Sequence, residues 1–116
     1  MKKLNIILTI IFAISTFSFA EEGGGKQTKE FFVDGVCEMC KKRIENACYD
    51  VKGVKYATWD IPSKTLKVIY KDSKVSQKEI ELAITQVGHD TENFTSPDSS
   101  YNKVHNCCKY REMDSH

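Results

Sequence analysis

Four short stretches of the chain are typical of β-strands, and in the second and third of them hydrophobic and polar side chains alternate with a period of two. The first stretch is centred on Phe31 and Phe32, and the last is centred on Phe94. The short turn Pro62-Ser63-Lys64 joins the second and third stretches, so these two are predicted to form an antiparallel hairpin. The predicted strands are 28–33, 54–61, 65–71 and 89–95.

Two other stretches carry apolar residues at i, i+3, i+4 and i+7, which is the spacing of one face of an α-helix. Ser76 and Glu79 form a capping-box pattern at the start of the second helix, and Gly53 and Gly88 are suited to end the two helices. Cys48 belongs to the first stripe and is predicted to be a core thiol. The stripes are Ile44, Ala47, Cys48 and Val51, after Cys40, and Ile80, Ala83, Ile84 and Val87.

The predicted elements follow one another in the order β-α-β-β-α-β. Two helices with one apolar stripe each are able to cover one face of a four-stranded antiparallel sheet. We therefore predict an α+β fold class, a ferredoxin-like βαββαβ sandwich with two helices on one face of the sheet, over residues 28–95.

Residues 1–20 have the pattern of a signal peptide. Lys2 and Lys3 give a positive start, residues 4–19 are mostly apolar and uncharged, and Ala20 is a suitable cleavage site. The apolar run is short for a transmembrane helix, so no stable membrane insertion is expected after cleavage. The sequence thus predicts an exported protein, periplasmic or secreted, with a flexible glycine-rich leader at residues 21–27.

The charge balance gives no support for nucleic-acid binding. Cleavage after Ala20 removes two lysines and no acidic residue, which leaves 15 basic and 16 acidic residues and a net charge of −1. Nucleic-acid binding requires a basic patch, so no nucleic-acid partner is expected. The 96 residues that remain of the 116 suit one small domain with a modest core.

Cys37 and Cys40 lie at the junction of the first predicted strand and the first predicted helix. The unpaired N–H groups and the positive dipole end of a helix N-terminus favour thiolates at this place. Two such thiolates bind a soft metal ion or cycle through a disulfide. An oxidising compartment favours disulfides, although the five cysteines of the chain are an odd number. The spacing alone leaves both chemistries open.

These residues resemble the heavy-metal-associated domain family of copper chaperones and metal-transporting ATPases. The resemblance covers residues 28–95. It implies that Cys37 and Cys40 bind Cu(I) and pass it by thiolate exchange to a metal-transporting ATPase or another metal-accepting protein. An exported single-domain member is also similar to the periplasmic mercury-binding protein of bacterial resistance systems, so Hg(II) and Zn(II) stay open beside copper. The resemblance rests on the Cys-x-x-Cys motif and on Ile44-Glu45-x-Ala47, Gly53-Val54 and Asp60-x-x-Ser63-Lys64-Thr65.

Three residues near the motif bear on its geometry. Val36 stands where the family usually has a methionine, and the loop before Cys37 is one residue shorter than the usual Gly-Met-x-Cys. Met39 lies between the cysteines, where its thioether packs or reaches a soft metal, and we favour packing. His89 stands in the turn after the second helix, which approaches the cysteine loop in this fold. Three roles stay open for His89: a third metal ligand, a proton acceptor for the thiols, or an ordinary surface residue.

Residues 96–116 form a tail that lies outside the domain pattern and carries His105 and the adjacent Cys107 and Cys108. Adjacent cysteines rarely bond each other, because the small ring strains the backbone. The two thiols are left as further ligands for an ion at the Cys-x-x-Cys motif, as disulfide partners of that motif, or as ligands of a separate ion with His105. The candidates for auxiliary ligands are His89, Cys107, Cys108, His105 and Met39.

Two interpretations compete with a metal carrier. A thiol–disulfide redox protein would use the same Cys37 and Cys40, but no tryptophan precedes Cys37, and neither Pro62 nor Pro97 is placed as the cis-proline of such a site. The other competitor is a disulfide- or zinc-stapled domain that only binds another protein. We expect no enzyme, since the sequence offers no nucleophile–base motif. A metal ion that bridges the thiolates of two chains would give a dimer.

Overall fold

The structure, a computed structural model, describes residues 25–112. The predicted signal peptide, the start of the leader and residues 113–116 therefore lie outside the described residues. None of the helices in residues 25–112 combines the length and the hydropathy that a membrane span requires. The elements are β1 (Lys26–Phe32), α2 (Glu38–Tyr49), β2 (Val54–Asp60), β3 (Thr65–Lys71), α3 (Gln77–Gln86), α4 (Asp98–Tyr101) and the 3₁₀ turns η3 (Asn106–Cys108) and η4 (Tyr110–Glu112).

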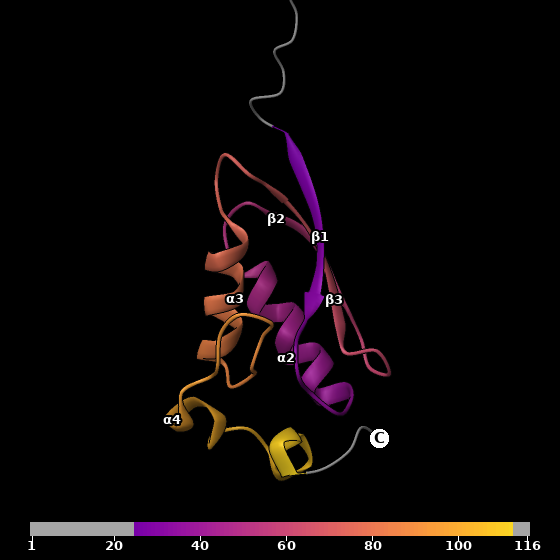
Figure 1. The fold of residues 1–116 in the computed structure, drawn as a ribbon, viewed down its shortest axis with the longest axis vertical. Helices are drawn as coiled ribbons and strands as arrows, with labels where there is room; N and C mark the ends of the chain where they lie inside the picture. The colour runs from indigo at the N-terminus through magenta and orange to yellow at the C-terminus, as the bar shows by residue number, and fades with distance from the viewer. Residues whose placement is uncertain (1–24, 113–116) are drawn as a thin grey trace, which may run out of the picture.

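The described strands form an antiparallel sheet in the order β1-β3-β2 (Figure 1). The central position of Leu66 in β3 shows the register, because Leu66 faces Phe31 of β1 on one side and Trp59 of β2 on the other. These three side chains are buried, and they belong to the sheet face that α2 and α3 cover. The predicted hairpin of β2 and β3 is confirmed.

The predicted fourth strand is not formed in the described residues. The region 89–95 contributes only one isolated bridge, between Thr91 and Val33. The chain turns back at once, since the Thr91 N–H donates to the carbonyl oxygen of Phe94 at 2.8 Å. Glu81 of α3 holds this turn: its buried carboxylate accepts from the Thr91 hydroxyl at 2.6 Å and from the Asn93 amide N–H at 3.0 Å. The Glu81 carboxylate thus binds the Asn93 backbone N–H, which is no longer available to a fourth strand, and ties the turn to α3.

The two main helices begin in different ways. Ser76 and Glu79 make the predicted capping box of α3. By contrast, α2 begins at Glu38, with Cys37 as its N-cap, so Cys40 lies inside the first turn instead of before the helix. The apolar stripes predicted for both helices are buried around Ile44 and Ile80.

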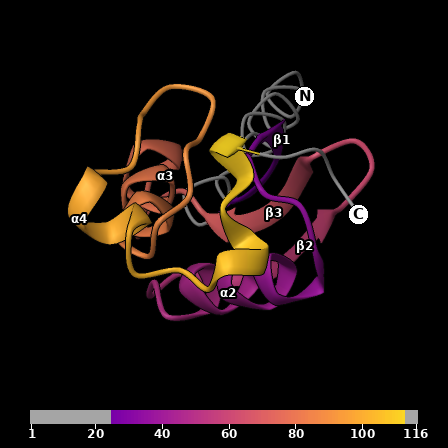
Figure 2. The same ribbon diagram turned by 90° about the horizontal axis from the view of Figure 1, so that it is seen from below.

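The segment predicted as a tail packs on the domain up to residue 112. Tyr101, Val104, Cys108 and Tyr110 are buried and belong to the same hydrophobic core as the sheet and helices. The segment runs from α4 beside α3 across the end of the molecule to the start of α2 (Figure 2). Gly88, which has a φ of +105°, permits the close approach, because a Cβ there would lie 2.6 Å from a Val104 methyl group.

Candidate metal centre

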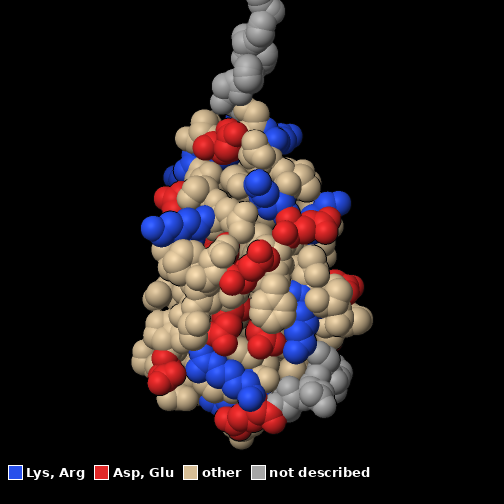
Figure 3. Space-filling model, viewed as in Figure 1, with Lys and Arg blue, Asp and Glu red and all other residues tan. Residues whose placement is uncertain are grey.

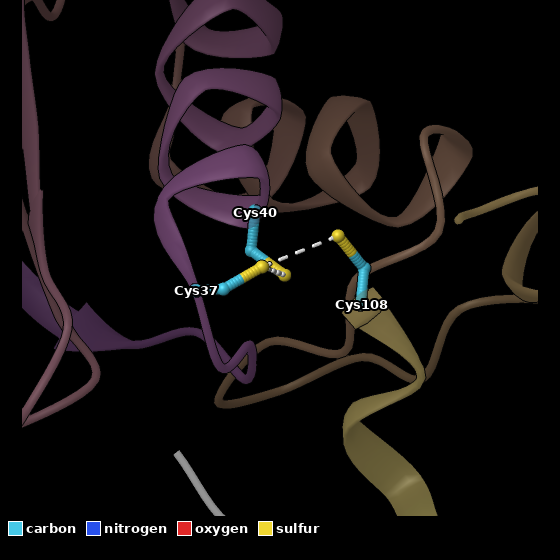
Figure 4. Close-up of side chains that lie close together, drawn as sticks. All are labelled: Cys37, Cys40 and Cys108. Carbon is cyan, nitrogen blue, oxygen red and sulfur yellow. Dashed lines mark hydrogen bonds between the residues drawn. The ribbon is translucent and has the colours of Figure 1, made fainter. Parts of the chain in front are cut away.

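Cys37 and Cys40 sit at the N-cap and in the first turn of α2, three positions apart, so their side chains share one face of the helix. Their sulfur atoms lie 3.7 Å apart. Cys40 is fully buried and Cys37 is 8% exposed. Both sulfurs point away from the sheet toward the segment that carries η3 (Figure 4).

The loop before α2 is shaped by Trp59, a residue that the sequence marked only as part of a strand. The Trp59 indole N–H donates to the carbonyl oxygen of Val33 at 2.9 Å. Its ring packs so closely on Gly35 that a Cβ there would meet it at 2.9 Å. The buried Val36 then directs its N–H at the Cys40 sulfur, 3.5 Å away. This packing holds the shortened loop in place although Val36 replaces the methionine of the family pattern.

Cys108 brings a third thiol to the pair. Its sulfur lies 3.5 Å from that of Cys37 (Figure 4). The side chain is fully buried. The sulfurs of Cys37, Cys40 and Cys108 all lie within 4.8 Å of one another. With metal–sulfur bonds of about 2.3 Å, three sulfurs around one ion are about 4.0 Å apart, so this trio has the dimensions of a three-coordinate soft-metal site.

The thiols of the motif differ in acidity. Burial opposes ionisation of Cys37, but the N–H of Cys40, the Cys108 thiol and the Cys40 thiol outweigh it and lower the pKa of Cys37 below its ordinary value. Burial raises the pKa of Cys40 to about 12, and the neighbouring Cys108 adds to that effect. Cys37 is thus the more acidic of the two motif thiols, and a bound cation would displace the proton of Cys40.

Cys107 and Met39 occupy the outer side of the same cluster. The Cys107 sulfur lies 3.4 Å from the Met39 sulfur and 4.0 Å from that of Cys108. Both Cys107 and Met39 are exposed. The adjacent cysteines therefore lie in different environments, with Cys108 in the buried trio and Cys107 at the surface.

His89 and His105 lie outside the buried trio. His89 is fully buried; its Nδ1 lies 2.8 Å from the Asp34 carbonyl oxygen and its Nε2 lies 3.2 Å from the Arg43 guanidinium. Burial, with a contribution from Arg43, lowers the pKa of His89 to about 4. The neutral ring thus braces the loop that leads to the cysteines. His105 is exposed at the start of η3.

A set of contacts that sequence reasoning missed fixes the segment carrying Cys108. The Tyr110 hydroxyl donates to the Gly88 carbonyl oxygen at 2.6 Å and accepts from the Asp90 N–H at 3.0 Å. Arg111 pairs with Asp90 at 2.7 Å, and its guanidinium lies 4.2 Å from the centre of the Tyr101 ring. The aromatic and arginine residues at 101–111 could have indicated this packing, because a segment surrounded by solvent gains no stability from such side chains.

An α+β sandwich with a helix-end cluster of cysteines defines a class of small soft-metal-binding domains. The sequence model of the heavy-metal-associated domain matches residues 30–90, and the chain belongs to that family.

Curated relatives and solved structures agree with this assignment. The copper chaperone CopZ of Staphylococcus epidermidis is 34% identical over 59 residues, which are 50% of this chain and 87% of that protein. A structure described as the CopZ metallochaperone matches with a TM-score of 0.55 and 30% identity, over 56% of this chain and 98% of that one. The N-terminal domain of a potential copper-translocating P-type ATPase from Bacillus subtilis, in the Cu(I)-loaded state, matches with a TM-score of 0.55 and 25% identity, over 58% and 85% of the two chains.

Proposed function

We propose that this protein is an exported carrier of a soft metal ion, with Cu(I) as its cargo, which it passes by ligand exchange to a metal-transporting ATPase or another metal-accepting protein. The observation that carries the proposal is the buried trio of Cys37, Cys40 and Cys108, with sulfurs within 4.8 Å of one another. The similarity to copper chaperones and to an ATPase domain supports copper and the kind of acceptor. The signal-peptide pattern of residues 1–20 supports export.

The number and kind of ligands favour copper over zinc. Three thiolates satisfy a soft monovalent or mercuric ion, whereas structural Zn²⁺ is held by four ligands in a tetrahedron. Cys107, the fourth nearby thiol, lies 4.0 Å from Cys108 but on the exposed side of the cluster. Hg(II) matches the same donor set, and a direct competition between Hg(II) and Cu(I) ranks the two ions.

Cargo transfer requires that an acceptor cysteine enters the coordination sphere. A three-coordinate ion accepts a new thiolate as one of its ligands leaves, so the ion is never free in solution. Cys108 is the ligand suited to leave, because it lies on a separate segment joined to the domain by polar and aromatic contacts. Cys37 and Cys40 stay fixed at the N-cap and in the first turn of α2.

A titration of the reduced protein with Cu(I) against a competing chelator tests the proposal. We expect tight binding that is lost in the Cys37→Ser/Cys40→Ser variant. The matched control is Cys48→Ala, which removes a buried thiol of α2 that is outside the trio. Unchanged affinity in the double variant would overturn the proposal.

A second candidate function, thiol–disulfide exchange, is favoured by the contrast between the lowered pKa of Cys37 and the pKa of about 12 at Cys40. The Cys37 thiolate would attack a substrate disulfide and release one substrate thiolate. A second cysteine of the trio would then displace the other substrate sulfur, so that the substrate is reduced and the protein oxidised. Reduction of insulin disulfides by the protein measures this activity, and a metal carrier shows none.

A further inference from the structure

The sulfur cluster extends beyond the buried trio to the surface. From Cys108 the next sulfur is that of Cys107, 4.0 Å away, and the next is that of Met39, 3.4 Å further. Cys40, Cys37, Cys108, Cys107 and Met39 therefore form an unbroken row of sulfur atoms.

The outer pair is assembled by two elements that are far apart in sequence. Met39 lies in the first turn of α2, between the two cysteines of the motif, and Cys107 lies in η3, 68 positions later. The 3₁₀ turn is closed by the Cys108 N–H, which donates to the His105 carbonyl oxygen at 2.8 Å. A 3₁₀ turn has 3.0 residues per turn, so successive side chains diverge by about 120°. Cys108 therefore points inward while Cys107 points out toward Met39.

Burial in the core does not explain the contact between Met39 and Cys107. Met39 is 41% exposed, and Cys107 is exposed as well, so neither side chain gains the burial that a core methionine or cysteine has. A thiol beside a thioether is, however, a soft donor set of the kind that selects Cu(I). The Cys107 sulfur lies 3.4 Å from that of Met39 and 4.0 Å from that of Cys108, and both distances are close to the separation of about 4.0 Å between two sulfurs bound to the same three-coordinate ion.

We propose that Cys107 and Met39, with Cys108 as a shared ligand, form a second and surface-exposed Cu(I) site. This inference rests on the proposed function only in that Cys108 also serves the buried trio. The protein then holds two ions, one enclosed and one open to solvent. An acceptor reaches the outer ion without displacing the segment 96–112. The Cys108 sulfur bridges the outer ion and the inner ion.

The test is the number of Cu(I) ions that the reduced protein takes from a chelator of moderate affinity. We expect two ions per chain, bound in two steps. Met39→Leu and Cys107→Ser, each nearly equal in shape to the native side chain, are expected to abolish the second step and leave the first unchanged. Cys48→Ala is the matched thiol control and keeps both steps. Both altered side chains are exposed, and thermal unfolding of the metal-free variants verifies that they fold.

Two results would overturn the second site: a single bound ion in the unaltered protein, or two ions still bound in both Met39→Leu and Cys107→Ser. Cys37→Ser/Cys40→Ser leaves the three outer ligands in place, so the proposed function is tested separately in a Cys107→Ser background, which lacks the outer site. It fails if an ion stays tightly bound after Cys37→Ser/Cys40→Ser is added to that background. The two inferences therefore stand or fall on different variants.

Discussion

The sulfur of Cys37 lies 3.5 Å from that of Cys108, although 71 positions separate the two residues along the chain. This contact converts a two-thiol helix end into an enclosed trio. It also makes the segment after α3 part of the candidate metal centre. The charge pattern alone does not indicate this, since acidic and basic side chains are interspersed over the face seen in Figure 3.

Cys108→Ser is expected to weaken Cu(I) binding at the inner site at least about tenfold, or about 1.4 kcal/mol. The variant removes one of three thiolates but leaves Cys37 and Cys40 in place. Chelator competition measures the change. The adjacent Cys107→Ser is the matched control and is expected to keep the affinity of the first ion. Equal affinities in both variants would remove Cys108 from the inner site.

Arg111→Gln is expected to speed the transfer of Cu(I) to a chelator or acceptor. The ion pair of Arg111 with Asp90 is partly exposed, with side-chain accessibilities of 26% and 23%, so its loss costs about 1 kcal/mol of docking free energy. That cost raises the open population of the segment about fivefold, and stopped-flow transfer rates report it. Lys103→Gln, on an exposed side chain of the same segment, is the control. A transfer rate equal to that of the unaltered protein would contradict this account of the segment.

Stability is expected to fall as the pH is lowered from 6.5 to 4. Burial holds the pKa of His89 at about 4, below the ordinary value of 6.5, and Arg43 adds to this effect while Asp34 and Asp90 oppose it. The unfolded chain therefore binds more protons in this window. The contribution of the neutral His89 to the free energy of unfolding is fully present above pH 6.5. The free energy of unfolding falls by about 3 kcal/mol by pH 4.

Denaturant unfolding at a series of pH values measures this dependence on the metal-free protein. His89→Gln is expected to flatten the profile between pH 4 and 6.5, whereas His105→Gln, on an exposed residue, is expected to keep it. The lowered pKa values of Glu81 and Asp90 reduce stability only as the pH falls toward and below their ordinary values of 4.5 and 3.8, at the lower end of this window. If His89→Gln left the profile intact and His105→Gln flattened it, the pH dependence would not arise from His89, and the prediction would be wrong.

Cu(I) affinity is expected to rise with pH. Burial raises the pKa of Cys40 to about 12, so at any lower pH the ion has to displace a proton from this thiol. Each displaced proton makes the apparent affinity about tenfold higher per pH unit. Chelator competition between pH 6 and pH 8, corrected for protonation of the chelator, measures the slope, and an affinity independent of pH would contradict a protonated Cys40.

Periodicity predicted much of this structure because the burial of one face of each element determines it. The stripes around Ile44 and Ile80 and the alternation around Leu66 each indicate a single buried face. The fourth strand was predicted from Phe94, but the outcome depends on Glu81, a charged residue in the middle of α3 whose buried hydrogen bonds fold the chain back. Pattern arguments assign such a residue to the solvent.

The cysteine cluster could be predicted from the sequence only in part. The spacing pointed to Cys37 and Cys40 as candidates, but the sequence gave no means to choose between Cys107 and Cys108. That choice is made by the orientation of one 3₁₀ turn, which depends in turn on the docking of Tyr110 against Gly88 and Asp90. His89 was a candidate for a ligand from its place in the turn after α3. The structure places it as a neutral brace between Asp34 and Arg43, outside the trio of Cys37, Cys40 and Cys108.

X-ray absorption spectroscopy on the reduced protein loaded with one equivalent of Cu(I) counts the sulfur atoms bound to copper. We expect three sulfur ligands in the unaltered protein and two in Cys108→Ser. Two sulfur ligands in the unaltered protein, or a coordination that Cys108→Ser leaves unchanged, would contradict this expectation.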